Sequence, residues 1–168
     1  MEYLYAPWRS AYTEDVVRTK EENTSAGECV FCQKLAGNAD EQHFILRRFK
    51  HTVVLLNLFP YNAGHLLVMP LQHCAALDAL DTETQQEMIW LVSKSTRILE
   101  DVLGAQGINI GLNLGKAAGA GVPSHLHMHV LPRWSGDTNF LPILAETKQV
   151  SFDLNKIYAK LKPAFDAL

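Results

Sequence analysis

The residues from Ser124 to Trp134 constrain the fold of this chain more than any other stretch. Three of its seven histidines, His125, His127 and His129, alternate here with apolar residues, which are Leu126, Met128 and Val130. Successive side chains of a β-strand point to opposite faces, so this period of two predicts a strand with the histidines on one face. On a helix the same spacing would spread the imidazoles around the axis. The apolar face can pack on a core, which leaves a row of imidazole nitrogens on a rigid element.

Such a row suits either metal binding or catalysis, because imidazole is the commonest metal ligand and also titrates near neutral pH. A single histidine on a strand is usually a surface or core residue, whereas three in alternation are not expected by chance. The segment just upstream, from Asn113 to Pro123, is rich in glycine and favours catalysis. Glycines let a backbone approach an anion closely and turn its N–H groups toward it. The segment is not a P-loop, since it lacks the Gly-Lys-Ser/Thr ending.

With these residues considered, the chain resembles the histidine triad (HIT) superfamily. The family signature is three histidines that alternate with apolar residues, as in His125–Leu131. Gly64–Pro70 is similar to the family's Gly-His strand, and Cys29–Cys32 is similar to its N-terminal Cys-x-x-Cys. The run Pro132–Phe140, with Ala6–Arg9, resembles the bacterial branch that is related to diadenosine tetraphosphate phosphorylases. The resemblance therefore spans most of the chain.

Length and composition predict one domain over residues 1–168, with an N-terminal arm over 1–28 and a C-terminal segment over 141–168. The hydrophobic fraction of 48% and the charged fraction of 20% are ordinary for a globular domain. A net charge of −3 gives no field that would recruit nucleic acid or a membrane. Without a long apolar run or a signal pattern, a cytoplasmic location is expected.

Strand patterns separated by turn residues predict an antiparallel sheet. Strands are expected over residues 43–48, 52–57, 65–69 and 107–114, followed by the triad strand, and the segment 59–64 is expected to be a turn. Together with two helical segments, and with what the family resemblance implies, these patterns predict an α+β, HIT-like fold. Its sheet of about five antiparallel strands would leave one face free for a site.

A long helix is predicted from about Thr84 to Leu103. Thr82 and Gln85 form a capping-box pattern, and Gly104 is a plausible C-cap. An apolar stripe at helical spacing is expected to be core: Met88, Leu91, Val92, Ile98, Leu99 and Val102. Residues 152–168 predict a short C-terminal helix that Pro163 would break near its end.

Cys29 and Cys32 predict a metal site. Three cysteines do not make a disulfide framework, but a Cys-x-x-Cys pair presents two thiolates to one tetrahedral metal, usually zinc. Two further ligands are needed, and in zinc-bearing members of the family they come from positions that match His73 and His125. A thioredoxin-like redox pair and simple buried cysteines are the alternatives. No organic cofactor is expected.

A mechanism follows from the histidine row. A neutral imidazole can attack phosphorus directly, provided that an acceptor holds its other nitrogen. We assign this role to His127, which would form a nucleotidyl-histidine intermediate. His129 could donate its N–H to a phosphate oxygen, and His125 would orient the row or bind zinc. The α-phosphate would be held by loop groups at Asn113, Gly119, Ala120 and Gly121.

The resemblance supplies the substrate class, which is a dinucleoside polyphosphate such as diadenosine tetraphosphate. It also implies that Asn57 lies near the ribose, that His65 packs beside the catalytic row, and that the protein is a homodimer. Either water or inorganic phosphate could take the nucleotidyl group. The segment 134–140 favours the phosphorylase branch, whereas Gly121 lacks the hydroxyl with which some relatives could bind phosphate.

Three alternatives stay open. The chain could hydrolyse dinucleoside polyphosphates, it could hydrolyse nucleoside phosphoramidates, or it could bind nucleotide or zinc without turnover. The N-terminal arm is also ambiguous, because its aromatic residues could pack on a partner subunit, cover a site or pack on the chain's own core; they are Tyr3, Tyr5, Trp8 and Tyr12.

Overall fold

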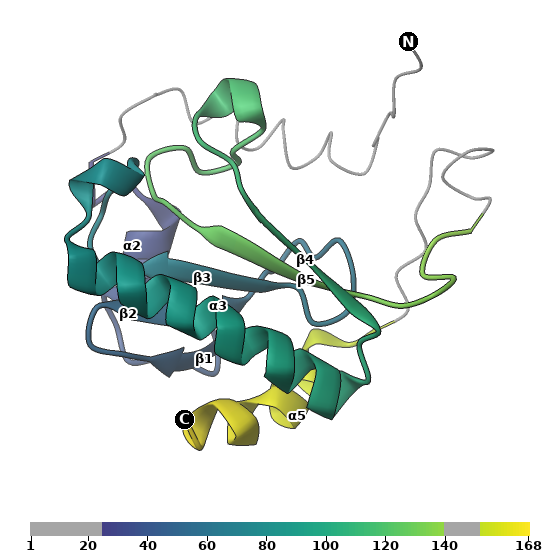
Figure 1. The fold of residues 1–168 in the computed structure, drawn as a ribbon. Coiled ribbons are helices and arrows are strands. Elements are labelled where there is room, and N and C mark those ends of the chain that lie inside the picture. The colour runs from purple at the N-terminus through teal and green to yellow at the C-terminus, as the bar shows by residue number, and fades with distance from the viewer. Residues whose placement is uncertain (1–24, 140–151) are drawn as a thin grey trace, which may run out of the picture.

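The computed structural model describes residues 25–139 and 152–168 (Figure 1). Within these residues five strands form one antiparallel sheet, in the order β1-β2-β3-β5-β4. The strands are β1 (Ile45–Arg48), β2 (Thr52–Leu56), β3 (Leu66–Pro70), β4 (Gly107–Leu112) and β5 (Met128–Arg133). The helices are α2 (Val30–Leu35), α3 (Thr82–Leu103) and α5 (Leu154–Asp166), with short 3-10 turns η1 (Leu77–Ala79) and η2 (Lys116–Ala118). The predicted α+β fold with an antiparallel sheet is confirmed.

The sheet carries a core on each face, because its inner strands β2 and β3 are buried along their whole length. Alternate residues, such as Val54 and Val68, pack against α3 and α5 in the larger core. Their neighbours, such as Val53 and Leu67, pack with Phe31 of α2 in a smaller core on the opposite face. The two long helices therefore cover one face, and the short helix covers part of the other.

Helix α3 buries the predicted stripe, although it begins differently from the prediction. Met88, Leu91, Val92, Ile98 and Leu99 are buried, and Val102 packs against them. The N-cap is Asp81, whose carboxylate accepts the Thr84 N–H at 2.7 Å. The predicted capping box at Thr82 is wrong, since the Gln85 amide donates instead to the carbonyls of Leu77 and Leu80. Gly104 ends the helix with φ 65°, as predicted.

Helix α5 contains Pro163 and continues past it to Asp166, so the predicted break is wrong. A proline removes one N–H, and here only the last turn of the helix follows it. That turn is stabilised by the fully buried Phe165. Arg47 of β1 also donates to the carbonyls of Phe165 and Asp166 at 3.0 and 2.8 Å, which satisfies acceptors that a helix end leaves unpaired.

The turn before β3 is held against the end of α3 by Gly64. This residue has φ +76°, and a Cβ there would lie 2.5 Å from the Leu103 Cδ1. Only glycine combines this backbone conformation with such close packing. The predicted turn over 59–64 is thus confirmed, and it ends beside the helix.

Some predictions concern residues outside the described ranges. They are the aromatic residues of the N-terminal arm, the Ala6–Arg9 motif, Phe140 and the segment 141–150. Among the described residues, no helix is both long and apolar enough to cross a membrane.

Candidate active site and metal cluster

The histidine row does not begin inside a strand. Strand β5 starts at Met128, so His125 and His127 precede it, and the prediction of a strand through all three is wrong. The pairing between β3 and β5 stops at Val68 and Met128. Two residues further along, β3 ends at Pro70, which has no N–H to donate. The Pro70 carbonyl instead accepts from the His125 ring, with Nε2 at 2.9 Å.

The predicted separation of apolar and histidine faces nevertheless survives. Leu126 and Val130 belong to the helix-side core, and Met128 packs against it. On the opposite face, the Phe31 ring of α2 contacts the rings of His125 and His127, at centroid distances of 5.6 and 5.2 Å. His125 is fully buried and His127 nearly so.

His127 is held in one tautomer by the backbone. Its Nδ1 lies 2.8 Å from the His125 carbonyl oxygen, which can only accept. Nδ1 therefore carries the proton, and Nε2 keeps the lone pair. Burial lowers the pKa of His127, so the ring stays neutral to lower pH than an exposed histidine. A neutral, oriented imidazole with its lone pair on Nε2 is the form that a nucleophile needs.

His65 is fully buried, and its tautomer can be assigned from backbone donors. The Tyr61 N–H points at His65 Nδ1, 3.2 Å away, and can only donate. The Asn57 amide is oriented by the Phe59 N–H, which donates to Oδ1 at 3.0 Å, so Nδ2 faces the same His65 nitrogen at 3.3 Å. Nδ1 of His65 is therefore an acceptor, and the proton of this ring sits on Nε2.

The tautomer of His65 determines the tautomer of His129, the third histidine of the row. His65 Nε2 lies 2.9 Å from His129 Nδ1, so it donates there, and the proton of His129 is left on Nε2. The Tyr61 ring lies almost parallel to the His129 ring, at a centroid distance of 6.0 Å. The centroids of the His127 and His129 rings are 5.1 Å apart. A lone pair on His127 and an N–H on His129 thus lie side by side.

The glycine-rich segment between β4 and β5 folds around η2. Gly115 and Gly119 bracket this turn with φ 77° and 84°. Asn113 donates to the Gly119 carbonyl at 3.4 Å, a bond within the loop rather than to the histidine row. Ala120 is buried, whereas Gly121 is partly exposed.

The register between β4 and β5 places this segment relative to the histidines. Leu112 pairs with Met128, so Asn113 follows at the level of His127. Gly111 pairs with His129, and a Cβ at Gly111 would meet nothing within 4 Å. The sheet therefore offers open space beside the third histidine.

Four residues that could hold a metal ion gather at the other end of the row. The ligand atoms of Cys29, Cys32, His73 and His125 all lie within 4.8 Å of one another. Cys32 Sγ is 3.2 Å from His73 Nδ1 and 3.4 Å from His125 Nδ1. Two sulfurs and two imidazole nitrogens are a donor set that suits tetrahedral zinc. The Pro70 carbonyl holds the opposite nitrogen of His125, as outer partners of metal ligands commonly do.

The environment of the thiols also fits a metal. Burial, followed by the neighbouring Cys29 thiol, raises the pKa of Cys32 to about 11. Such a thiol gives up its proton only to a strong competitor, and a bound cation is one. His125 connects the two parts of the site, because its ring faces the cysteines while its carbonyl holds His127.

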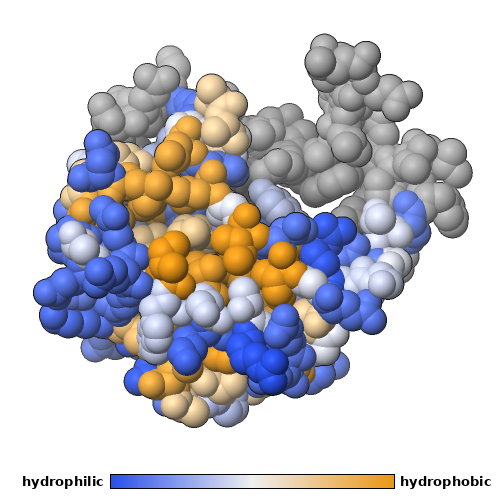
Figure 2. All heavy atoms as spheres, viewed as in Figure 1, coloured by the Kyte–Doolittle hydropathy of each residue, from blue (hydrophilic) through white to orange (hydrophobic). Residues whose placement is uncertain are grey.

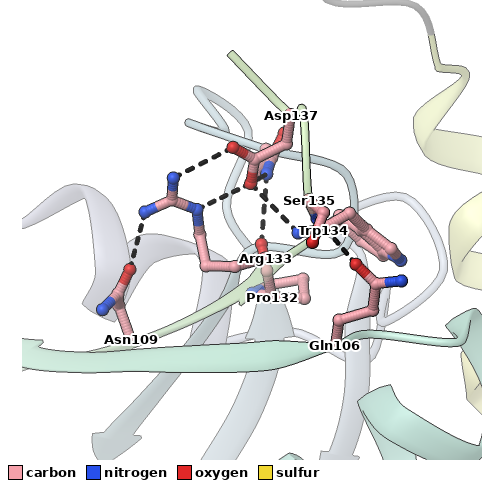
Figure 3. Close-up of polar contacts among 8 residues, drawn as sticks. Gln106, Asn109, Pro132, Arg133, Trp134, Ser135 and Asp137 are labelled. Carbon is pink, nitrogen blue, oxygen red and sulfur yellow. Dashed lines mark hydrogen bonds and ion pairs between the residues drawn. The ribbon is translucent and has the colours of Figure 1, made fainter.

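Sequence reasoning missed a polar cluster at the far end of β5 (Figure 3). Arg133 forms a two-pronged ion pair with Asp137, at 2.6 and 2.9 Å, and also donates to Asn109 at 2.8 Å. The Asp137 side chain is only 7% exposed. Asn62, in the turn before β3, donates to the same carboxylate at 2.8 Å. In the sequence, the signal for this cluster was the opposite charges of Arg133 and Asp137, which are four residues apart.

Comparisons with known proteins agree with this geometry. The HIT domain model matches residues 38–136. AP-4-A phosphorylase of Mycobacterium tuberculosis is 34% identical over 150 residues, which cover 89% of this chain and 77% of that protein. The asymmetrical bis(5'-nucleosyl)-tetraphosphatase of Schizosaccharomyces pombe is 33% identical over 93 residues, which cover 55% and 50% of the two chains. The crystal structure of a Zn-bound histidine triad family protein from Mycobacterium smegmatis has a TM-score of 0.69 and 28% identity, covering 85% and 96%.

Proposed function

Because this chain belongs to the HIT domain family, we propose that it is an enzyme that cleaves dinucleoside polyphosphates, such as diadenosine tetraphosphate, at an α-phosphate. The observation that carries this proposal is the His127 imidazole, neutral and locked with its lone pair on Nε2, beside the N–H of His129. The relatives named as a phosphorylase and a tetraphosphatase support the substrate class.

Each residue of the site has a separate role in the first step of the reaction. His127 Nε2 attacks the α-phosphorus, and the bond from this phosphorus to the bridging oxygen breaks, which leaves a nucleotidyl-histidine intermediate. The Nε2–H of His129 donates to the departing oxygen and stabilises its negative charge. Asn113 and the backbone N–H groups of Gly119, Ala120 and Gly121 hold the α-phosphate oxygens. Asn57 contacts the ribose, and its amide also orients His65.

Inorganic phosphate then takes the nucleotidyl group from His127. The resemblance of the segment 132–140 to the phosphorylase branch and the 34% identity to a phosphorylase support this acceptor. Water is the second candidate, because Gly121 has no hydroxyl for phosphate and one relative is named as a tetraphosphatase. Nucleoside phosphoramidates are the alternative substrates for hydrolysis.

Analysis of the products tests both the reaction and the acceptor. With diadenosine tetraphosphate and inorganic phosphate, we expect ADP and ATP, because the phosphate adds to the transferred adenylyl group. Radiolabelled inorganic phosphate should appear in the ADP. AMP and ATP in equal amounts, whether or not phosphate is present, would replace phosphorolysis by hydrolysis. Tight nucleotide binding without any cleavage would favour a binding protein.

We propose that Cys29, Cys32, His73 and His125 hold zinc, and that the role of the metal is structural. Four protein donors close a tetrahedral site, which leaves no open position for substrate. The zinc in the Mycobacterium smegmatis relative supports this choice of metal. The metal would fix α2 against the loop that precedes β5.

We also propose that the protein is a homodimer. In the described sheet β4 is an edge strand, and Ile110 on it is 50% exposed. Figure 2 shows further apolar side chains over the face where α3 and β4 lie, and Ile89 and Trp90 of α3 are exposed. An apolar edge of this kind is commonly covered by a partner. Light scattering at micromolar concentration should give twice the chain mass of 18.8 kDa, and a monomer mass would contradict the proposal.

A further inference from the structure

We propose that Asp137 is a positioning residue, which acts through Asn62 on the ring of His65. By this route it selects which nitrogen of His129 carries the proton. The inference deepens the proposed function and rests on it, because it concerns the atom of His129 that faces the leaving group. A continuous set of contacts joins the Arg133–Asp137 ion pair to the histidine row.

The first link is the Asp137 carboxylate, which is a fixed acceptor. Arg133 donates to both of its oxygens, and the Trp134 N–H donates to Oδ2 at 3.2 Å. Hydrogen bonds from Arg133, with smaller effects from Trp134 and Asn62, hold the pKa of Asp137 well below its usual range. The carboxylate is therefore ionised at any ordinary pH, and a buried ionised group keeps its donors in place.

The second link is Asn62, which ties the turn over 59–64 to the end of β5. Its Nδ2 has two hydrogens, and both are used: one goes to Asp137 Oδ2 at 2.8 Å, and the other to the Pro132 carbonyl at 3.1 Å. These partners lie 75 and 70 residues away in the sequence. The main chain of the same residue holds the start of β3, because the Asn62 carbonyl accepts the His65 N–H at 3.2 Å.

The third link is the Tyr61 N–H, which precedes Asn62 and donates to His65 Nδ1. While this donor is in place, Nδ1 of His65 cannot carry a proton. The Asn57 amide is the second donor to this nitrogen, and the Phe59 N–H that orients it lies in the same turn. If the turn moves, the Tyr61 N–H is displaced and the Asn57 amide can rotate its Oδ1 toward His65, so that Nδ1 can be protonated and Nε2 becomes an acceptor. His129 Nδ1 must then supply the proton between the two rings, and His129 Nε2 is left with a lone pair. No net proton is gained or lost, yet the group that faces the leaving oxygen changes from donor to acceptor.

A purely structural role for Asp137 makes a different prediction. An ion pair that only fastened the end of β5 would change the free energy of unfolding when broken, and would leave the tautomers of His65 and His129 unchanged. The chain offers a matched control in the ion pair between Arg48 of β1 and Asp40, which precedes this strand. This pair also uses two nitrogens of the guanidinium. Arg48 Nη2 and Nε lie 2.8 and 3.0 Å from Asp40 Oδ1, and Nε lies 3.3 Å from Asp40 Oδ2.

The test is nitrogen NMR of labelled histidine side chains in the full chain, purified without chelator and without substrate. Long-range proton–nitrogen couplings distinguish the two neutral tautomers. In the wild-type protein we expect both His65 and His129 to carry the proton on Nε2. In Asn62→Ala and Asp137→Asn, both rings should populate the Nδ1-protonated form. Asp40→Asn should keep the wild-type tautomers.

Kinetics supply the second measurement. A lost hydrogen-bond donor acts on the transition state more than on binding, so kcat of Asn62→Ala should fall by about tenfold to a hundredfold while KM changes by less than about threefold. A folded Asn62→Ala or Asp137→Asn protein with both rings still protonated on Nε2 would overturn the proposal. If neither variant folds, the wild-type spectrum decides, since a His65 ring protonated on Nδ1 contradicts the assignment directly.

The two hypotheses fail separately. If the tautomers shift as expected while the wild-type protein cleaves no dinucleoside polyphosphate, the proposed function is wrong and the positioning role of Asp137 stands. If the wild-type protein turns over and the variants keep their tautomers, only the positioning role is lost.

Discussion

Replacement of His127 by alanine or asparagine is expected to lower turnover by about a thousandfold or more, as for other covalent catalytic residues. Nucleotide binding should be largely kept, because a nucleophile contributes mainly along the reaction path, whereas Asn113 and the loop amides also hold the ground state. Neither His125 nor His129 can take over, since the first ring faces the cysteines and the second is bonded to His65. Steady-state rates with diadenosine tetraphosphate and equilibrium binding of the same nucleotide measure the two effects.

Two further variants provide rates with which the loss in His127→Ala can be compared. His129→Ala should cost about a hundredfold to a thousandfold, the range for loss of one donor to a developing negative charge. His51→Ala is the control, because the His51 ring contacts Glu83 of helix α3 rather than a residue of the row. It should keep near wild-type rates.

The covalent step can be observed directly. Quenching the wild-type enzyme during turnover should trap label from the α-phosphate on the protein, in an acid-labile, base-stable linkage. A His127→Ala protein with more than about a tenth of wild-type activity, a barrier change under ~1.4 kcal/mol, would falsify the covalent mechanism.

Loss of the metal is expected to have the largest effect on stability. Protein purified without chelator should contain about one equivalent of zinc. A ligand that binds only the folded state, at a free concentration a thousand times its Kd, stabilises that state by about 4 kcal/mol. Chelation, or Cys32→Ser, should remove a contribution of this order from the free energy of unfolding. Metal analysis and thermal unfolding with and without chelator measure it.

The third cysteine provides the matched control for this experiment. Cys74 lies outside the cluster, and its thiol donates to the Ala76 carbonyl at 3.0 Å, a bond that a serine hydroxyl can replace. Cys74→Ser should therefore keep the zinc content and the response to chelator. Protein without metal, with freely titratable thiols at Cys29 and Cys32, would show that the cluster is only a set of buried side chains.

Local patterns were enough to predict most of the fold. The apolar stripe of α3 and the alternation of Leu126, Met128 and Val130 predicted which side chains enter the helix-side core, because both signals depend on periodicity within one segment. The start of β5 could not be predicted in this way. It depends on Pro70 in a different strand, whose missing N–H ends the pairing before it reaches His127.

The parts of the site that sequence reasoning missed depend on contacts between distant segments. The bond between His65 and His129 joins residues 64 positions apart, and the resemblance supplied only that they are neighbours. The charges of Arg133 and Asp137 indicate at most a local ion pair, and nothing in the sequence shows that the Asp137 carboxylate meets Asn62. The tautomers follow only when each backbone donor is placed, since a histidine in a sequence can carry its proton on either nitrogen.

His125 has a consequence for how this protein can change over evolutionary time. Its ring contacts the cysteines, and its main-chain carbonyl accepts a hydrogen bond from His127. A substitution at this position deletes the ring but cannot delete the carbonyl. The metal cluster and the orientation of the neighbouring imidazole are therefore encoded by separable parts of one residue. A lineage could replace the two cysteines and both metal-facing rings with apolar side chains, one mutation at a time, and still inherit the main-chain acceptor beside His127.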